Sequence, residues 1–224
     1  MRRAFVRRGS EHGVAHARER APALAASPGR WHDVRRMATR APKDPPATYA
    51  DLEALPSQVI GQIIDGELVA LPRPAIPHAT VRSTLGEELG PPFRRGRGGP
   101  GGWVLLDEPE LHFGKNVLVP DLAGWRRERL PEVPAAPYLT LAPDWVCEVV
   151  SPSSSSIDRV RKPRIYAREG VAWIWIIDPD GRSLEVLKLD GESYRIVDAF
   201  EGDEPVRAAP FDAIELELGL LWRA

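Results

Sequence analysis

Two carboxylates in apolar, strand-like surroundings are the residues of this chain whose types most strongly suggest chemistry. Glu148 lies inside the run WVCEVV, residues 145–150, and Asp121 follows Pro120 in VLVPDLAGW. A carboxylate among buried apolar side chains must be protonated, paired with a cation or bound to a metal ion. If the two strands are neighbours, the carboxylates can approach within about 5 Å. Because a shared divalent cation would remove their repulsion, the pair suggests a site for Mg²⁺ or Mn²⁺.

Other interpretations of these carboxylates stay open on the sequence alone. Glu148 could form a buried salt bridge with Lys162 or with an arginine of the same predicted helix. Asp121 could be a turn residue that follows Pro120. The residues on either side of Glu148 alternate between two apolar faces, which is typical of a central strand with both faces covered. Glu148 would share its face with Val146 and Val150.

The elements that must position these carboxylates follow from the spacing of apolar residues. TYADLEALP predicts a short helix capped by Thr48, and QVIGQIIDGELVALP predicts a hairpin that turns at Asp65-Gly66. Residues 76–89 have helical spacing. WVLLDE, ELHFG and VLVPDLAGW give three strand signals before the strand that carries Glu148.

The second half of the chain continues this mixed pattern. Residues 155–170 predict a helix that Pro163 weakens unless it lies in the first turn. AWIWIIDPDGRSLEVLKL predicts a strand, a turn and a strand; SYRIVDAF continues the meander, and FDAIELELGLLW predicts a last strand. The chain is therefore expected to form an α/β (α+β) fold with a mixed central β-sheet and few flanking helices.

The Arg-rich start of the chain differs in charge from the remainder. Residues 1–36 hold nine of the 30 Lys and Arg residues and three of the 32 Asp and Glu residues, so the remainder is acidic. We expect residues 1–47 to be a disordered extension, with Met37 as the functional start, and residues 48–224 to form one domain. A transit peptide or a basic arm for nucleic acid are the alternatives. The acidic domain can approach a polyanion only after cations screen its carboxylates.

The composition also narrows the class of protein. Cys147 is the single cysteine, which excludes an intramolecular disulfide and a cysteine-based zinc cluster. No apolar run approaches the ~20 residues that span a bilayer, and no secretory signal is recognisable, so we expect a cytoplasmic protein. PPFRRGRGGPGG, residues 91–102, contains three arginines that could touch a phosphate backbone or could belong to a solvated loop.

Several motifs in order resemble a known family. The segment PDLAGW, the segment from APDWVCEVVSPSSSS to RSLEVLKL, and the earlier IIDGELVALPRPAIPHATV are similar to the Uma-two family of restriction-endonuclease-like proteins, within the PD-(D/E)XK nuclease superfamily. The resemblance covers about residues 48 to 222. It implies a restriction-endonuclease-like core, a DNA substrate, Mg²⁺ or Mn²⁺ as cofactor, and a homodimer.

The resemblance also implies roles for individual residues. Asp121 and Glu148 would be the metal-binding and catalytic acids, with Glu67 a further acid and Lys162 the catalytic lysine. His78, Asp158 and Tyr166 are secondary candidates that are expected nearby. The superfamily lysine normally follows the acid by two residues, where this chain has Val150. Lys162 on the next helix is the substitute.

Two functions therefore compete. The first is a metal-dependent endonuclease that hydrolyses DNA phosphodiester bonds, in which a carboxylate-bound cation activates water and lysine stabilises charge. The second is a catalytically inactive scaffold of the same fold that binds nucleic acid or serves in defence. RNA is a further possible substrate.

Overall fold

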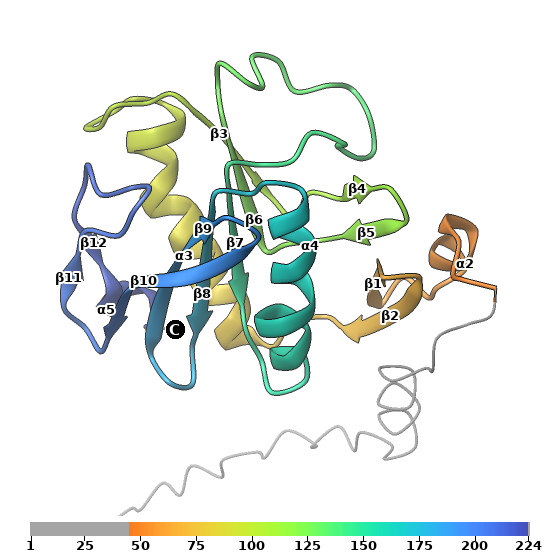
Figure 1. Ribbon diagram of the computed structural model, residues 1–224. Helices are drawn as coiled ribbons and strands as arrows, with labels where there is room; N and C mark the ends of the chain where they lie inside the picture. The colour runs from red at the N-terminus through yellow and green to blue at the C-terminus, as the bar shows by residue number, and fades with distance from the viewer. Residues whose placement is uncertain (1–44, 224) are drawn as a thin grey trace, which may run out of the picture.

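A mixed β-sheet of six strands organises residues 45–223, which the computed structural model describes (Figure 1). The strand order is β10-β9-β8-β7-β6-β3. The bounds are β3 Trp103–Asp107, β6 Leu122–Arg126, β7 Trp145–Val149, β8 Trp173–Asp178, β9 Ser183–Asp190 and β10 Ser193–Glu201. β7 and β8 pair in parallel and the other neighbours pair antiparallel. The predicted fold class, a mixed sheet with few flanking helices, is confirmed.

Two helices cover the two faces of this sheet. Helix α3 (Ile76–Leu89) packs on one face and continues into a π-helical turn, η1 (Gly90–Arg94). Helix α4 (Lys162–Arg168) packs on the other face and follows a second π-helical turn, η2 (Ile157–Arg161). The crossover through α4 joins the parallel strands β7 and β8, as such a connection requires (Figure 1).

The predicted helix over 155–170 is therefore present, but it is not one regular α-helix. Pro163 lies in the first turn of α4, where its missing N–H costs little. The π-helical turn precedes it. The sequence did not indicate η1 either, because residues 91–102 had been expected to be a loop throughout.

A second sheet of four strands, in the order β2-β1-β5-β4, flanks the first. Its strands are β1 Val59–Ile64, β2 Glu67–Pro72, β4 Leu111–Phe113 and β5 Asn116–Leu118. The β1–β2 hairpin turns at Asp65-Gly66 as predicted, and both residues have positive φ. Helix α2 (Tyr49–Glu53) begins at the Thr48 cap, which was also predicted.

The strand expected across VLVPDLAGW is divided. Its first part, β5, belongs to the four-stranded sheet and its second part, β6, to the six-stranded sheet. Pro120 and Asp121 connect them, and a proline cannot donate to a strand ladder. The expected final strand is reduced to β12 (Leu216–Glu217), which pairs with β11 (Pro205–Val206) and leads into helix α5 (Leu218–Leu221).

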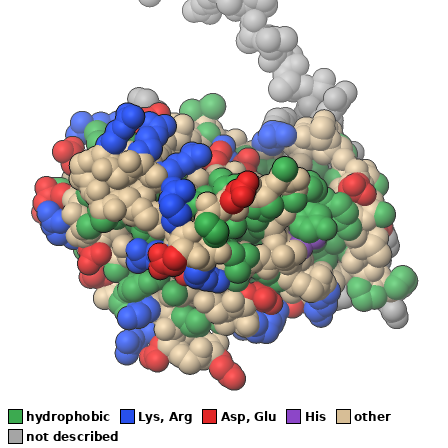
Figure 2. Space-filling view, turned by 90° about the horizontal axis from the view of Figure 1, so that it is seen from above, with side chains coloured by type: hydrophobic (Ala, Val, Ile, Leu, Met, Phe, Trp, Pro, Cys, Tyr) green, Lys and Arg blue, Asp and Glu red, His purple; other side chains and the backbone are tan. Residues whose placement is uncertain are grey.

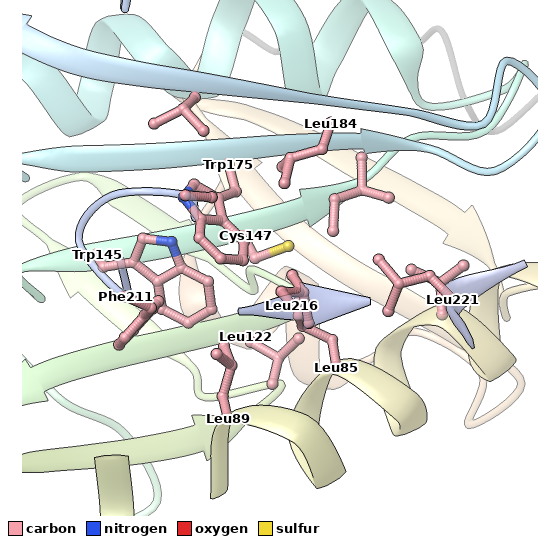
Figure 3. Close-up of a cluster of buried hydrophobic side chains, with 14 of the residues drawn as sticks. Leu85, Leu89, Leu122, Trp145, Cys147, Trp175, Leu184, Phe211, Leu216 and Leu221 are labelled. Carbon is pink, nitrogen blue, oxygen red and sulfur yellow. The ribbon is translucent and has the colours of Figure 1, made fainter. Parts of the chain in front are cut away.

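The core has two parts, one on each face of the six-stranded sheet. On the α3 side, Trp145 and Cys147 of β7 pack with Trp175, Phe211 and apolar residues of α3 (Figure 3). On the α4 side, Val146 and Val150 pack with residues of α4 and β8. The alternation predicted for β7 is therefore confirmed: Glu148 belongs to the side that faces α4.

Candidate active site

Glu148 is buried near the end of β7, a strand with neighbours on both edges. Its side chain is 1% exposed, and β7 lies between β6 and β8. All five residues of β7 are buried, so the carboxylate is largely removed from bulk water and needs close partners. Its partners must come from the elements packed above it.

Helix α4 supplies two of these partners. The Lys162 ammonium donates to Glu148 Oε2 at 2.8 Å, and the Tyr166 hydroxyl donates to Oε1 at 2.6 Å. Residues four apart on a helix share a face, which explains why both reach the same carboxylate. Lys162 also contacts Asp158 Oδ1 at 3.0 Å and donates to the Val119 carbonyl at 3.3 Å.

The charges in this group are unbalanced. Burial raises the pKa of the Glu148 carboxyl to about 8; the Lys162 ammonium acts against this rise and Asp158 adds to it. Burial favours the neutral amine of Lys162, but Asp158 and Glu148 outweigh it, so its pKa lies above the ordinary value. One buried ammonium thus stands among the carboxylates of Asp158, Glu148 and nearby Asp121. The surplus negative charge favours a proton or an additional cation.

Asp121 lies beside the end of β7, where the register places it. Leu122, the first residue of β6, pairs with Cys147 in the antiparallel register. Asp121, which precedes it, therefore lies next to the last residues of β7. Asp121 Oδ2 accepts a hydrogen bond from the Val149 N–H at 2.8 Å, and Oδ1 lies 3.3 Å from His78 Nε2. This confirms that the strands of the two predicted acids are neighbours.

A small pocket brings the candidates together. Asp121, Glu148, His78, Asp158 and Lys162 all line it, and its volume is about 60 Å³. One water needs roughly 10–15 Å³ of such space, so the pocket has room for a small ion with water. The elements that meet here are β1, β2, α3, β7, η2 and the first residue of α4.

The donor set fits Mg²⁺ in a specific way. In the part of the chain that the structure describes, no three His, Cys, Asp or Glu side chains come together to hold a metal ion by themselves. Mg²⁺ commonly uses only one or two carboxylates and completes its shell with water and substrate phosphates. Asp121 and Glu148 fit that arrangement as hard oxygen donors.

Two of the predicted residues, Glu67 and Tyr166, do not line this pocket. Glu67 does not line the pocket; its carboxylate pairs with Arg161 at 2.8 Å, so the structure does not bring it into the group. Val150, at the usual lysine position, is buried in the core on the α4 side. Its N–H donates to the Ile177 carbonyl at 2.8 Å. Tyr166 touches Glu148 without lining the pocket.

One lining residue was missed by sequence reasoning. Glu108 follows β3 with a positive φ of 44° and forms an ion pair with Arg82 of α3. An acid directly after a predicted strand, in WVLLDE, was the available signal. It resembled an ordinary turn residue, because the contact with α3 comes from a segment 26 residues earlier.

Comparisons with known proteins agree with this architecture. A family model named Uma2 and described as "Putative restriction endonuclease" matches residues 46–219. A solved structure from Anabaena variabilis ATCC 29413, described as "a putative nuclease belonging to DUF820", is 23% identical with a TM-score of 0.64. The match covers 79% of this chain and 98% of that chain, which shows a shared fold. No curated protein matches this chain. Among residues 45–223, no helix is long and apolar enough to cross a membrane.

Proposed function

The chain belongs to the Uma2 family, whose description is "Putative restriction endonuclease", and on this premise we propose that it hydrolyses DNA phosphodiester bonds with Mg²⁺ or Mn²⁺. One observation carries the proposal. Asp121 and the Glu148–Lys162 pair converge on one pocket from separate elements of the fold. The lysine that the strand lacks at Val150 is thus supplied by α4.

Asp121 and Glu148 are the residues that would hold the cation. When bound, such a cation lowers the pKa of water and screens phosphate oxygens. The Val149 N–H fixes one oxygen of Asp121 and Tyr166 fixes one oxygen of Glu148. These bonds orient the two carboxylates before any ligand arrives, which reduces the entropy lost on binding.

Lys162 is the residue whose ammonium would stabilise the negative charge that develops on the reacting phosphate. Its raised pKa keeps the ammonium protonated at neutral pH, so it serves as a donor and not as a base. A buried ammonium that lines the pocket stabilises developing negative charge more strongly than one in water. His78, 3.3 Å from Asp121, is placed to hold that carboxylate or to exchange a proton with it.

A plasmid cleavage assay with the full chain tests the proposal. We expect nicking or linearisation in Mg²⁺ or Mn²⁺, and none in EDTA. Asp121→Asn and Glu148→Gln preserve shape while removing charge, so each should reduce the cleavage rate by at least about 100-fold, the order seen when one charge-stabilising group is lost. Asp190→Asn, an exposed carboxylate on β9, is the matched control and should retain full activity.

Circular dichroism and thermal unfolding of each variant separate lost chemistry from lost fold. Calorimetry with Mn²⁺ adds a readout that does not depend on cleavage: wild type and Asp190→Asn should bind, and Asp121→Asn should not. Cleavage that persists undiminished in both Asp121→Asn and Glu148→Gln would refute the proposal.

One observation favours a second candidate, a catalytically inactive scaffold that binds nucleic acid. Both oxygens of Glu148 already have partners, Lys162 and Tyr166, so the buried salt bridge is complete without a metal ion. For that candidate, calorimetry would detect no Mn²⁺ binding and DNA or RNA would remain intact. A homodimer, proposed because both strands of a duplex must be cut, is tested by light scattering with and without DNA.

A further inference from the structure

A groove separate from the acidic pocket runs between helix α3 and strand β3, the edge strand of the six-stranded sheet. Its volume is about 510 Å³. Small residues of α3 and η1, namely Ser83, Gly86 and Gly90, form one side, and Leu105 and Leu106 of β3 form the other. An added Cβ at Gly90 would meet nothing within 4 Å, so this side is open.

One end of the groove reaches the candidate active site. Arg82, which lines the groove, contacts Asp107 at 3.1 Å and also pairs with Glu108. Glu108 in turn lines the acidic pocket with Asp121. A chain that lies in the groove can therefore continue into the pocket past Arg82 and its two carboxylate partners, Asp107 and Glu108.

The other end of the groove is positively charged, although the carboxylate of Glu87 also lines the groove. Arg94 and Arg95 line it, and Arg97 follows in the same loop; all three are exposed. No carboxylate within the described residues pairs with any of them, whereas most other arginines near the site have such partners. Figure 2 shows Lys and Arg side chains gathered on the face seen from above.

Hydrogen bonds hold the backbone of the loop that carries these arginines in place. The N–H groups of Arg97 and Gly101 donate to the carbonyls of Pro91 and Pro92, both at 2.8 Å. The Arg127 guanidinium donates to the Arg94 carbonyl at 3.3 Å and to the Trp103 carbonyl at 3.0 Å. These bonds fix the backbone and add a further positive charge beside the loop.

We propose that this groove holds the sugar-phosphate backbone of one DNA strand, which runs from the acidic pocket to Arg94 and Arg95. The inference rests on the proposed function, because it supplies the track that leads substrate to that pocket. Twelve residue steps lead from Arg82 to Arg94, which is roughly 18 Å at the α-helical rise. A track of that length spans several phosphates of one DNA strand. Arginine guanidinium groups are suited to bidentate phosphate binding.

Salt-dependent DNA binding tests the groove with charge-matched variants. The full chain is titrated with a labelled 20-base-pair duplex in Ca²⁺, and gels check that the DNA stays intact. Arg94→Gln/Arg95→Gln removes two charges from the groove. Arg182→Gln/Arg195→Gln removes two exposed charges near the opposite edge of the sheet. The groove variant should lower the slope of log affinity against log salt by about two, since each phosphate contact contributes about 0.9.

Further arms make the result decisive. Ser83→Trp fills the groove without changing its charge; because Ser83 is exposed, the fold should survive and DNA affinity should fall at least about tenfold. Equal slopes for the two double variants would overturn the inference. A changed oligomeric state in Arg94→Gln/Arg95→Gln with unchanged DNA affinity would also overturn it, because the groove would then be a contact between copies of the chain.

The inference and the proposed function can fail separately. If wild type cleaves DNA in a manner that depends on Asp121 but the groove variants bind normally, the groove inference falls alone. If the groove variants lose affinity while neither metal binding nor cleavage is detected, the groove stands and the nuclease proposal falls. If wild type neither binds nor cleaves DNA, both fall.

Discussion

The two faces of strand β7 pack against different kinds of partner. Toward α3, Trp145 packs edge-to-face with Trp175 and Phe211, at ring separations of 5.4 and 4.8 Å. Toward α4, three residues further along, Glu148 is enclosed by Lys162 and Tyr166. The first face depends on filled volume and the second on matched charge. The backbone of one strand thus supports a hydrophobic core on one face and an ionic site on the other.

This difference shows how a fold can carry a buried charge. The aromatic side is held chiefly by packing: among the described residues, the buried indole N–H of Trp145 has no hydrogen-bond partner. Because the aromatic side already holds the strand, the charged side needs only a few directional contacts, those of Glu148 with Lys162 and Tyr166. Substitutions that alter volume should therefore damage the α3 face, and substitutions that alter charge should damage the α4 face.

The largest expected effect comes from emptying the aromatic side. Phe211 is 2% exposed and contacts Phe93, Trp103, Trp145 and Trp175. Phe211→Ala should lower the free energy of unfolding by about 3–5 kcal/mol, measured by urea denaturation. Phe211→Leu should cost less because it leaves a smaller cavity, and exposed Ile196→Ala is the control. A loss below about 1 kcal/mol for Phe211→Ala would show that this face does not depend on volume.

The next effect comes from removing the single cation of the charged side. Lys162→Met keeps the length of the side chain but leaves Glu148 and Asp158 without it, which should cost about 3 kcal/mol. Exposed Lys188→Met, which removes only a contact with the Trp173 ring, should cost about 0.5–1 kcal/mol.

A double-mutant cycle sharpens this result. In the Glu148→Gln background, Lys162→Met should be less damaging because one carboxylate has already lost its charge. Additive effects of Lys162→Met and Glu148→Gln in the unfolding measurement would contradict the coupling of the two residues.

The smallest of these effects concerns one neutral hydrogen-bond donor. Tyr166→Phe removes the hydroxyl that donates to Glu148 Oε1 and changes little volume, so it should cost about 1–2 kcal/mol. Tyr138→Phe, at a tyrosine that is 39% exposed, serves as the matched control and should leave stability unchanged. If both tyrosine variants unfold like wild type in urea, the hydroxyl is not part of the charged side.

The parts of this structure that the sequence predicted well depend on local periodicity. Alternation in β7 placed Glu148 opposite Trp145 and Cys147, and the Asp65-Gly66 turn fixed the hairpin. Lys162 was predicted as the replacement for the lysine missing at Val150, and its contact with Glu148 follows from a helix that returns across the sheet. The alternation in β7 and the hairpin turn could be predicted because each depends on residues that are close in the sequence.

What the sequence could not provide depends on distant segments. The division of VLVPDLAGW between two sheets arises because β5 pairs with β1 while β6 pairs with β3 and β7. Glu67 was grouped with the site by the family resemblance, but Arg161, 94 residues later, is its partner. Metal binding, the substrate and the catalytic roles stay predictions, since they concern groups outside the chain.

The number of residues in the π-helical turn η2, between β7 and α4, sets the direction in which Lys162 and Tyr166 point from α4. An α-helix advances about 100° per residue, so one residue inserted or deleted within 157–161 would rotate Lys162 and Tyr166 together away from Glu148. Point substitutions there alter one contact at a time, whereas a change of length removes both at once. Residue spacing along this connection, more than the identity of most residues in it, determines whether the strand and helix form one site.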